Sequence, residues 1–414
     1  MRVSHLALTD YRSYKSAVVE LSPGTTVLQG RNGRGKTNFV EAIAYLGTFS
    51  SHRGGSSANL VRISPDGEEQ PGGAVIRAKI ESEGHSDLVE LEIARGRANR
   101  ARLNRAKVSP REVLGVLRSV IFAPEDLNLL RGDPAGRRTF LDEIAVKLKP
   151  HHLGTLQDFQ KVSRQRAAAL KQLQKARFSA PEDVAVLDVW DEQISQLSAV
   201  IVAHRIAVVA AMRPHVMQAY ADLTDEDRVA ELDYVSRLNR DVLSVDLDPA
   251  DFRVEEGQFV GDSNPLVSRL NTAYRQETAE RRDLEILRGV NLVGAHRDDL
   301  GATLDSLPVK GFASHGEMWS MALTLRLAEA EVLKRDQSYP VLILDDVFAE
   351  LDRNRRSGLI ECIGRAEQAI ITVAVPEDVP AELHARAFEV LRSEDGSTHI
   401  REATDQPSGE EQGD

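Results

Sequence analysis

An eight-residue stretch near the N-terminus constrains this chain more than any other feature. Residues 30–37 match the pattern G-x-x-x-x-G-K-[ST]. In such a loop the glycines let backbone N–H groups turn toward a chain of phosphates, the lysine reaches the β and γ phosphates, and the hydroxyl ligates Mg²⁺. Average composition would produce this pattern by chance in roughly 1 chain in 100 of this size, so an incidental glycine-rich turn is the weaker interpretation. The candidate nucleotide-binding residues are Gly30, Arg31, Asn32, Gly33, Arg34, Gly35, Lys36 and Thr37.

The segments on either side of this loop suit a phosphate site. Residues 25–29 read as a short buried strand, and residues 38–46 place apolar side chains at helical spacing. The phosphates would therefore lie at a helix N-terminus, where the dipole and unpaired N–H donors favour anions.

A second apolar segment ends in two acids. Residues 341–346 read VLILDD, which predicts a buried parallel strand that delivers carboxylates at its C-terminal edge, where open α/β sheets bind ligands. We expect Asp345 to hold Mg²⁺, together with Thr37. Asp346, one residue further, is placed to orient or deprotonate the attacking water and, with Lys36, is a predicted catalytic residue.

The order of patterns along the chain predicts four parts. Residues 1–135 carry the phosphate loop and strands of β-hairpin type, residues 136–289 are mostly helical, and residues 290–398 return to strands interleaved with helices. Residues 399–414 are acidic and read as a disordered tail. We therefore expect an α/β protein with an inserted helical lobe.

The composition limits the compartment and the partners. The net charge of −12 argues against a uniformly basic nucleic-acid binder, so a DNA contact would need a local patch. The single cysteine, Cys362, suggests a reducing compartment. The N-terminus lacks the apolar core of a signal peptide, and the apolar run 197–212 is interrupted by His204 and Arg205. We expect a cytoplasmic protein.

One local basic patch is present at residues 95–107, which we call the basic ribbon. Six arginines and lysines occur there with no acid between them, on a predicted hairpin that could track DNA phosphates. A solvated, charge-protected sheet edge explains the ribbon about equally well. Arg53, in a polar loop after the first helix, could likewise reach a phosphate or DNA, or could simply be solvated.

Residues 314–317, Ser-His-Gly-Glu, precede a predicted helix about 30 residues before the acidic strand. They resemble the signature motif of ABC-type ATPases, which closes over the γ phosphate bound by another subunit. Leu351 and Asp352 match the D-loop of the same superfamily. The resemblance adds Ser314, Gly316 and Glu317 to the nucleotide-binding candidates.

Together these motifs resemble the heads of the SMC-like ABC ATPases and, within that group, the RecF family. The segments that carry the narrower resemblance are residues 10–14, 124–127, 137–142, 294–300 and 313–317. It covers residues 1 to about 375. The implied fold is an ABC-type P-loop ATPase head of mixed sheet and helices with an inserted lobe.

The resemblance also implies a function, because family members are ATP-dependent DNA repair proteins. It implies ATP and Mg²⁺ as cofactors, an ATP-dependent homodimer, and binding to double-stranded DNA and gap junctions. It further implies action with RecO and RecR to promote RecA loading, and a contribution to the SOS response. The ATPase itself would be weak, DNA-stimulated and used as a switch.

Three departures from the ABC pattern bear on turnover. No histidine occurs from residue 369 to 378, and the second carboxylate is Asp346 where transporters use glutamate. Residues 124–126, Pro-Glu-Asp, stand where a glutamine is expected, and Glu125 is a further candidate for the Mg²⁺ site. These changes predict slow hydrolysis, with ATP acting as a dimerisation switch.

Two alternatives and one question stay open. The chain could be the ATPase subunit of a membrane transporter, although the helical insertion and the missing histidine argue against it. It could be a tethering or nuclease-associated relative, although the insertion is too short for long arms. Residues 296–299 could touch nucleotide, DNA or one another, and a structural ion network is the simplest interpretation.

Overall fold

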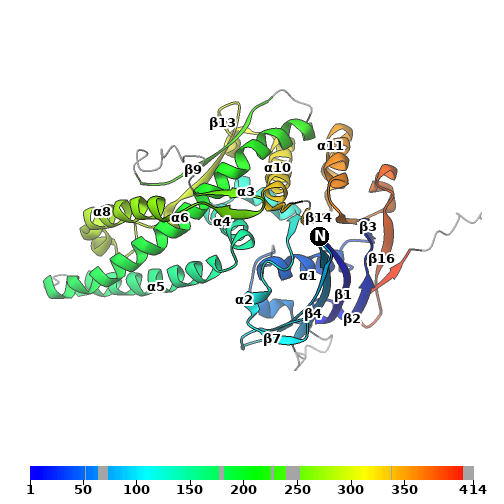
Figure 1. Ribbon diagram of the computed structural model, residues 1–414, viewed down its shortest axis with the longest axis horizontal. Helices are drawn as coiled ribbons and strands as arrows, with labels where there is room; N and C mark the ends of the chain where they lie inside the picture. Colours follow the sequence, from blue (N-terminus) through cyan, green and yellow to red (C-terminus); the bar gives the residue numbers. More distant parts are fainter. Residues whose placement is uncertain are drawn as a thin grey trace, which may run out of the picture. The chain divides into compact units, whose positions relative to one another are not determined.

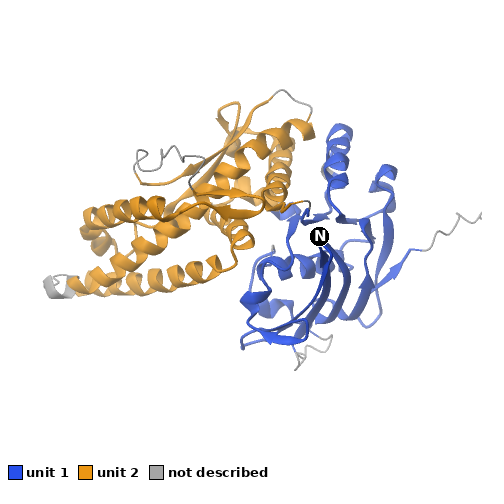
Figure 2. Cartoon of the chain, in the orientation of Figure 1, with its two compact units in different colours: residues 1–125, 338–414 blue, residues 126–337 orange. Residues whose placement is uncertain are grey.

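The computed structural model describes residues 1–51, 53–63, 73–176, 181–224, 228–238, 252–336 and 338–403. The chain divides into two compact units (Figure 2). The first comprises Met1–Glu125 and Ser338–Asp414, and the second comprises Asp126–Gln337. The signature-like motif, which the sequence analysis placed in a head segment at 290–398, therefore packs in the same unit as the inserted helices.

The first unit contains an antiparallel six-stranded sheet in the order β2-β1-β4-β5-β6-β7. Its strands are β1 Arg2–Tyr11, β2 Tyr14–Glu20, β4 Ala74–Ser82, β5 His85–Ile93, β6 Arg100–Leu103 and β7 Ala106–Val108. One of the hairpins expected in residues 1–135 is formed by β1 and β2, whose paired residues run from His5–Glu20 to Tyr11–Tyr14.

A second six-stranded sheet in this unit has the order β17-β16-β3-β15-β14-β8 and is parallel except at β17. Its strands are β3 Gly24–Gln29, β8 Ser119–Phe122, β14 Val341–Asp345, β15 Gln368–Val373, β16 Arg386–Arg392 and β17 Thr398–Glu402. The unit's helices are α1 Lys36–Thr48, α2 Pro110–Val113 and α11 Arg353–Gly364. One apolar core joins α1 to both sheets. β17 extends into the expected tail, and residues 404–414 lie outside the described residues.

The second unit is built around one long helix (Figure 1). Its helices are α3 Leu127–Arg131, α4 Pro134–Leu148, α5 His152–Ala176, α6 Pro181–Thr224, α8 Asn264–Arg288, α9 Val309–Phe312 and α10 His315–Leu333. Its strands are β9 Ala230–Val235, β12 Asp299–Leu304 and β13 Leu307–Pro308 in one sheet, and β10 Arg253–Glu255 with β11 Gln258–Val260 in another. α5, α8 and α10 all pack on α6. Helices α4, α5, α6 and α8 lie in or overlap the segment 136–289 that was expected to be mostly helical, and β9, β10 and β11 lie in the same segment.

α6 is apolar around most of its circumference because it lies at the centre of these contacts. Residues 185–224 are long and apolar enough to cross a membrane by length and composition, but 67% of the most apolar window is buried inside the protein. Arg205, within this stretch, makes two hydrogen bonds to the Asp142 carboxylate at 2.7 and 2.8 Å. A core helix of a globular unit accounts for this pattern.

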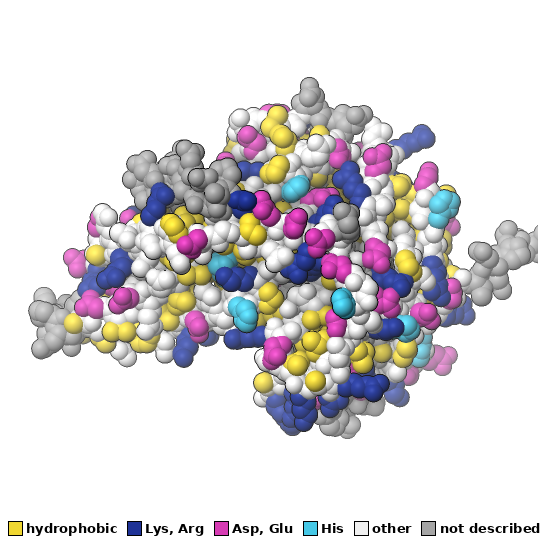
Figure 3. Space-filling model, in the orientation of Figure 1, with side chains coloured by type: hydrophobic (Ala, Val, Ile, Leu, Met, Phe, Trp, Pro, Cys, Tyr) yellow, Lys and Arg dark blue, Asp and Glu magenta, His cyan; other side chains and the backbone are white. Residues whose placement is uncertain are grey.

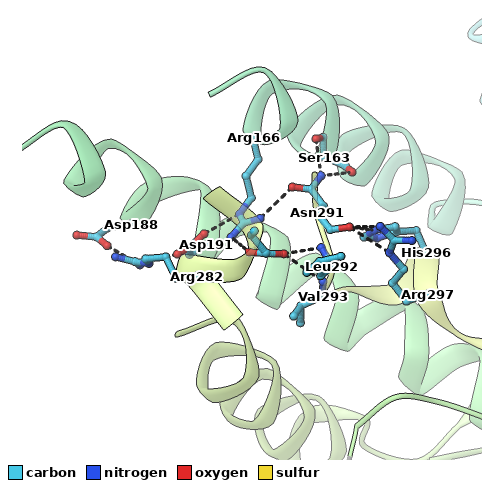
Figure 4. A network of polar contacts seen from close by, with 11 residues as sticks. Ser163, Arg166, Asp188, Asp191, Arg282, Asn291, Leu292, Val293, His296 and Arg297 are labelled. Carbon is cyan, nitrogen blue, oxygen red and sulfur yellow. Dashed lines mark hydrogen bonds and ion pairs between the residues drawn. The ribbon is translucent and has the colours of Figure 1, made fainter. Parts of the chain in front are cut away.

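The segment after α8 differs from the sequence prediction. The segment 291–300 was expected to form a strand and a turn, but the first strand there, β12, begins at Asp299. The backbone N–H groups of Leu292 and Val293 instead donate to Glu285 Oε1 at 2.6 and 3.2 Å (Figure 4). Because a buried side chain satisfies these donors, no neighbouring strand is needed.

Residues 296–299 are occupied by contacts inside the second unit. His296 and Arg297 donate toward the backbone oxygen of Asn291 (Figure 4). Asp298 accepts from the Tyr234 hydroxyl at 2.7 Å, and Asp299 pairs with Arg137 at 2.6 Å. These contacts make the segment a polar brace between α4, α8 and β9.

Candidate nucleotide site

A cavity of about 820 Å³ lies in the first unit, at the carboxyl ends of β3, β14 and β15. It brings together the phosphate loop, the acidic strand and the turn between β1 and β2. The lining residues include Arg12, Ser13, Asn32, Gly33, Gly35, Lys36, Thr37, Asn38, Arg53, Arg62, Pro124, Glu125, Asp345, Asp346, Thr372 and Arg392.

The phosphate loop is held in shape by its neighbours. Gly35 has φ 110°, and a Cβ there would lie 2.8 Å from both Ser13 Oγ and Thr398 Oγ1, so only glycine fits. The Tyr14 hydroxyl donates to Gly35 O at 2.9 Å, and Thr398 Oγ1 donates to Arg34 O at 2.9 Å. The loop therefore leads into α1 with a fixed backbone.

Lys36 is 5% exposed, and its ammonium points back into the loop. It donates to Gly30 O at 2.5 Å and to Asn32 Oδ1 at 3.3 Å. Burial lowers the pKa of Lys36, while the nearby carboxylates of Asp346 and Asp345 act in the opposite direction. A buried cation next to acids is suited to bind a polyanion that displaces its weak local partners.

Asp345 forms the centre of an oxygen cluster. Its Oδ1 accepts hydrogen bonds from Thr37 Oγ1 at 3.2 Å and from Thr372 Oγ1 at 2.5 Å. A hydroxyl and a carboxylate are the donor types that Mg²⁺ takes at phosphate loops, with the remaining positions filled by water and phosphate. Among the described residues, no cluster of three or more His, Cys, Asp or Glu side chains that could hold a metal ion is found.

Asp346 follows β14 in a left-handed conformation, with φ 55°. Its N–H donates to Thr372 Oγ1 at 3.0 Å. Asp346 and Glu125 both line the cavity beside Asp345. The structure thus places the predicted catalytic and Mg²⁺ candidates around one space.

Arg12 and Thr372 are among the cavity residues that the sequence analysis did not identify. Arg12 binds Glu41 of α1 through two hydrogen bonds, at 2.8 and 2.7 Å, although 29 positions separate them. Thr372 lies opposite Asp345 in the parallel register of β14 and β15. A hydroxyl at the end of the strand beside an acidic strand is a signal that could have identified Thr372. Nothing local pairs Arg12 with Glu41.

Arg53 also lines the cavity and donates to Asn38 Oδ1 at 3.1 Å. The rest of its loop is described except for residue 52. Arg53 therefore lies where it could contact a phosphate of a nucleotide bound in the cavity.

The signature-like motif forms the start of α10 in the second unit. Ser314 is exposed and is the N-cap residue, with Oγ accepting from Glu317 N at 3.3 Å. Glu317 Oε2 accepts from Ser314 N at 2.6 Å, which completes a capping box. Gly316 lies in the first turn of α10 and is partly exposed. Asp352, in the D-loop match, caps α11 by accepting from Arg355 N at 3.0 Å.

The basic ribbon includes the hairpin of β6 and β7 and is mostly exposed. Figure 3 shows Lys and Arg side chains gathered at the end of the first unit where Figure 1 labels β7. Part of its charge is compensated, because Arg100 lies 3.8 Å from Glu92. Its exposed members are Arg97, Arg100, Arg102, Arg105 and Lys107.

A family model described as the RecF/RecN/SMC N terminal domain matches residues 2–398. The DNA replication and repair protein RecF of Pseudarthrobacter chlorophenolicus is 44% identical over 403 residues, covering 94% of this chain and 98% of that protein. RecF of Beutenbergia cavernae is 46% identical over 404 residues, covering 95% and 99%.

Two solved structures share the fold. The structure of the recombination mediator protein RecF-ATPrS in the RecFOR pathway has a TM-score of 0.77 at 22% identity, over 96% of this chain and 98% of its own. An SMC head bound to the C-winged helix domain of ScpA has a TM-score of 0.52 at 14% identity, over 98% of each chain. The fold is that of an α/β ABC ATPase head.

Proposed function

Since the chain belongs to the RecF family of DNA replication and repair proteins, we propose that it binds ATP with Mg²⁺ and uses ATP to pair with a second copy of itself on duplex DNA. The observation that carries this proposal is the cavity around Lys36, Thr37, Asp345 and Thr372. A relative of known structure is described with a bound ATP analogue, which supports the same ligand here.

Each residue of the cavity has a separate task in this proposal. The loop from Gly30 to Gly35 wraps the phosphates with backbone N–H groups, and Lys36 neutralises the β and γ phosphates. Thr37 and Asp345 would hold Mg²⁺, with Glu125 nearby; the ion, when bound, neutralises charge on the phosphate oxygens. Asp346 orients the attacking water.

The signature-like motif acts on the other copy. Ser314 is exposed and Gly316 is partly exposed at the start of α10, where the helix end carries N–H groups and the Ser314 hydroxyl. Such an end attracts the γ phosphate of nucleotide held by a second chain. ATP hydrolysis would then separate the two copies. Because Asp346 has no histidine partner for activating the attacking water, this hydrolysis is slow.

The family supports a cytoplasmic role in recombinational repair and replication restart. ATP-bound dimers would lie on double-stranded DNA at single-strand gaps, with the basic ribbon contacting phosphates, and would act with RecO and RecR to promote RecA loading and the SOS response. Reversing the charges of Arg100, Arg102 and Arg105 should flatten the salt dependence of duplex binding. An unchanged salt dependence would indicate that the basic ribbon is a solvated sheet edge that does not contact DNA phosphates.

Sedimentation with ATP and Mg²⁺ tests the pairing directly. Wild type should shift from monomer to dimer, Lys36→Ala should fail to bind ATP, and Ser314→Arg should bind ATP but remain monomeric. Dimerisation by both variants would overturn the proposal.

A further inference from the structure

Glu317 is fixed in place by two separate partners. Its Oε2 accepts from Ser314 N at 2.6 Å, and its Oε1 contacts the Arg228 guanidinium. The side chain is 21% exposed. Both carboxylate oxygens of Glu317 therefore have partners within the second unit.

Arg228 is itself held rigidly. It follows α6, which ends at Thr224, and precedes β9. Its Nε donates to Asp305 Oδ2 at 2.7 Å, and Asp305 Oδ1 accepts from Val229 N at 2.9 Å. The backbone adds a further link, because Asp305 N donates to Val229 O at 2.9 Å.

The positive charge of Arg228 offsets the negative charge of Glu317 at the start of α10. A carboxylate in the first turn stabilises α10, but it also places a negative charge beside an outward-facing phosphate-binding end. An arginine held against that carboxylate cancels the repulsion and keeps the Ser314 cap formed. The same contacts attach α10 to the segment that follows α6.

We propose that Arg228, braced by Asp305, is a positioning residue that orients and neutralises Glu317 so that the Ser314 end of α10 can accept the nucleotide phosphates of a second copy. This inference rests on the proposed ATP-dependent dimer. A symmetric dimer contains the contact twice, so about a tenfold loss at each seam would raise the dimer dissociation constant about a hundredfold.

A double-mutant cycle tests the proposal by sedimentation with ATP and Mg²⁺. Arg228→Ala should raise the dimer dissociation constant about a hundredfold and leave ATP binding by the monomer unchanged. In a Glu317→Gln background, where no carboxylate needs neutralising, the same Arg228→Ala change should cost less than about fivefold. Arg228→Lys should recover part of the loss.

The matched control is Arg213→Ala, because Arg213 also links α6 to β9, through Leu232 O at 2.8 Å and Asp233 at 3.0 Å. It should dimerise as wild type does. If Arg228→Ala fails to fold, Arg228→Gln takes its place in the cycle. Equal losses with and without the Glu317→Gln change, or no loss at all, would overturn the inference. A wild type that never dimerises with ATP would instead overturn the proposed function.

Discussion

Arg166 is the most completely buried arginine among the residues that the structure describes, and its removal should unfold the second unit at a much lower temperature. Its guanidinium contacts Asp191 at 2.6 Å, Glu285 at 2.5 Å and Asn291 at 2.9 Å (Figure 4). Breaking such a buried pair leaves uncompensated charge and costs about 3–5 kcal/mol. For a unit of about 200 residues, each kcal/mol shifts Tm by about 2–4 °C. Arg166→Ala should therefore lower Tm by about 6–20 °C.

Tryptophan fluorescence is a suitable readout, because both tryptophans of the chain, Trp190 and Trp319, lie in the second unit. The control is Arg275→Ala, since Arg275 is 57% exposed and pairs with Glu192 at only 3.5 Å; it should cost less than about 1 kcal/mol. Adding Glu285→Gln should relieve part of the Arg166→Ala loss. Equal Tm values for the two alanine variants would refute the assignment of Arg166 as a main stabilising residue of this unit.

Acid should destabilise the second unit through His152 and His204, whose ring centroids lie 4.4 Å apart. Burial lowers the pKa of His152 to about 2 and that of His204 to about 4, whereas unfolded imidazoles titrate near 6.5. Below about pH 6.5 the unfolded chain therefore binds more protons than the folded chain does. The free energy of unfolding should fall as the pH drops from about 6.5 toward 4, by about 1.4 kcal/mol per pH unit for each ring. His152→Phe should flatten that slope in urea titrations, and the same change at exposed His151 should not. Thr372→Val should weaken Mg²⁺-dependent ATP binding about tenfold in titration calorimetry, since the Asp345 carboxylate and the Asp346 N–H each lose a hydrogen-bond partner. Thr26→Val, on the adjacent strand, is the control. Equal losses of ATP affinity in the two variants would contradict the assignment of Thr372 to the nucleotide site.

Local sequence patterns were sufficient to predict a feature when one short segment contains all the residues that define it. The phosphate loop and the strand ending at Asp345 were predicted because each is contiguous and each has a fixed spacing of chemistry.

Contacts between distant segments could not be read in the same way. Arg12 reaches Glu41 only because the turn after β1 lies beside α1, and Thr372 meets Asp345 only through the register of β14 and β15. Residues 291–293 look like a strand by composition, but Glu285 takes up their N–H groups. Such pairings depend on the tertiary fold, and no local spacing encodes them.

The division into two units could not be predicted from local sequence patterns either. The helix of the signature-like motif has no clear polar face, because it is buried on several sides. Its packing on α6 places it with the inserted helices, which chain order alone did not indicate.

Mixing two defective variants measures the central claim most directly, because a nucleotide held between two copies needs Lys36 from one and Ser314 from the other. Lys36→Ala and Ser314→Arg chains should each stay monomeric with ATP and Mg²⁺. When they are combined, the Ser314→Arg chain supplies an intact phosphate loop and the Lys36→Ala chain supplies an intact Ser314, so one complete seam forms. Sedimentation of the mixture should then show an ATP-dependent heterodimer. A mixture that stays monomeric while wild type dimerises would contradict a site shared between two chains.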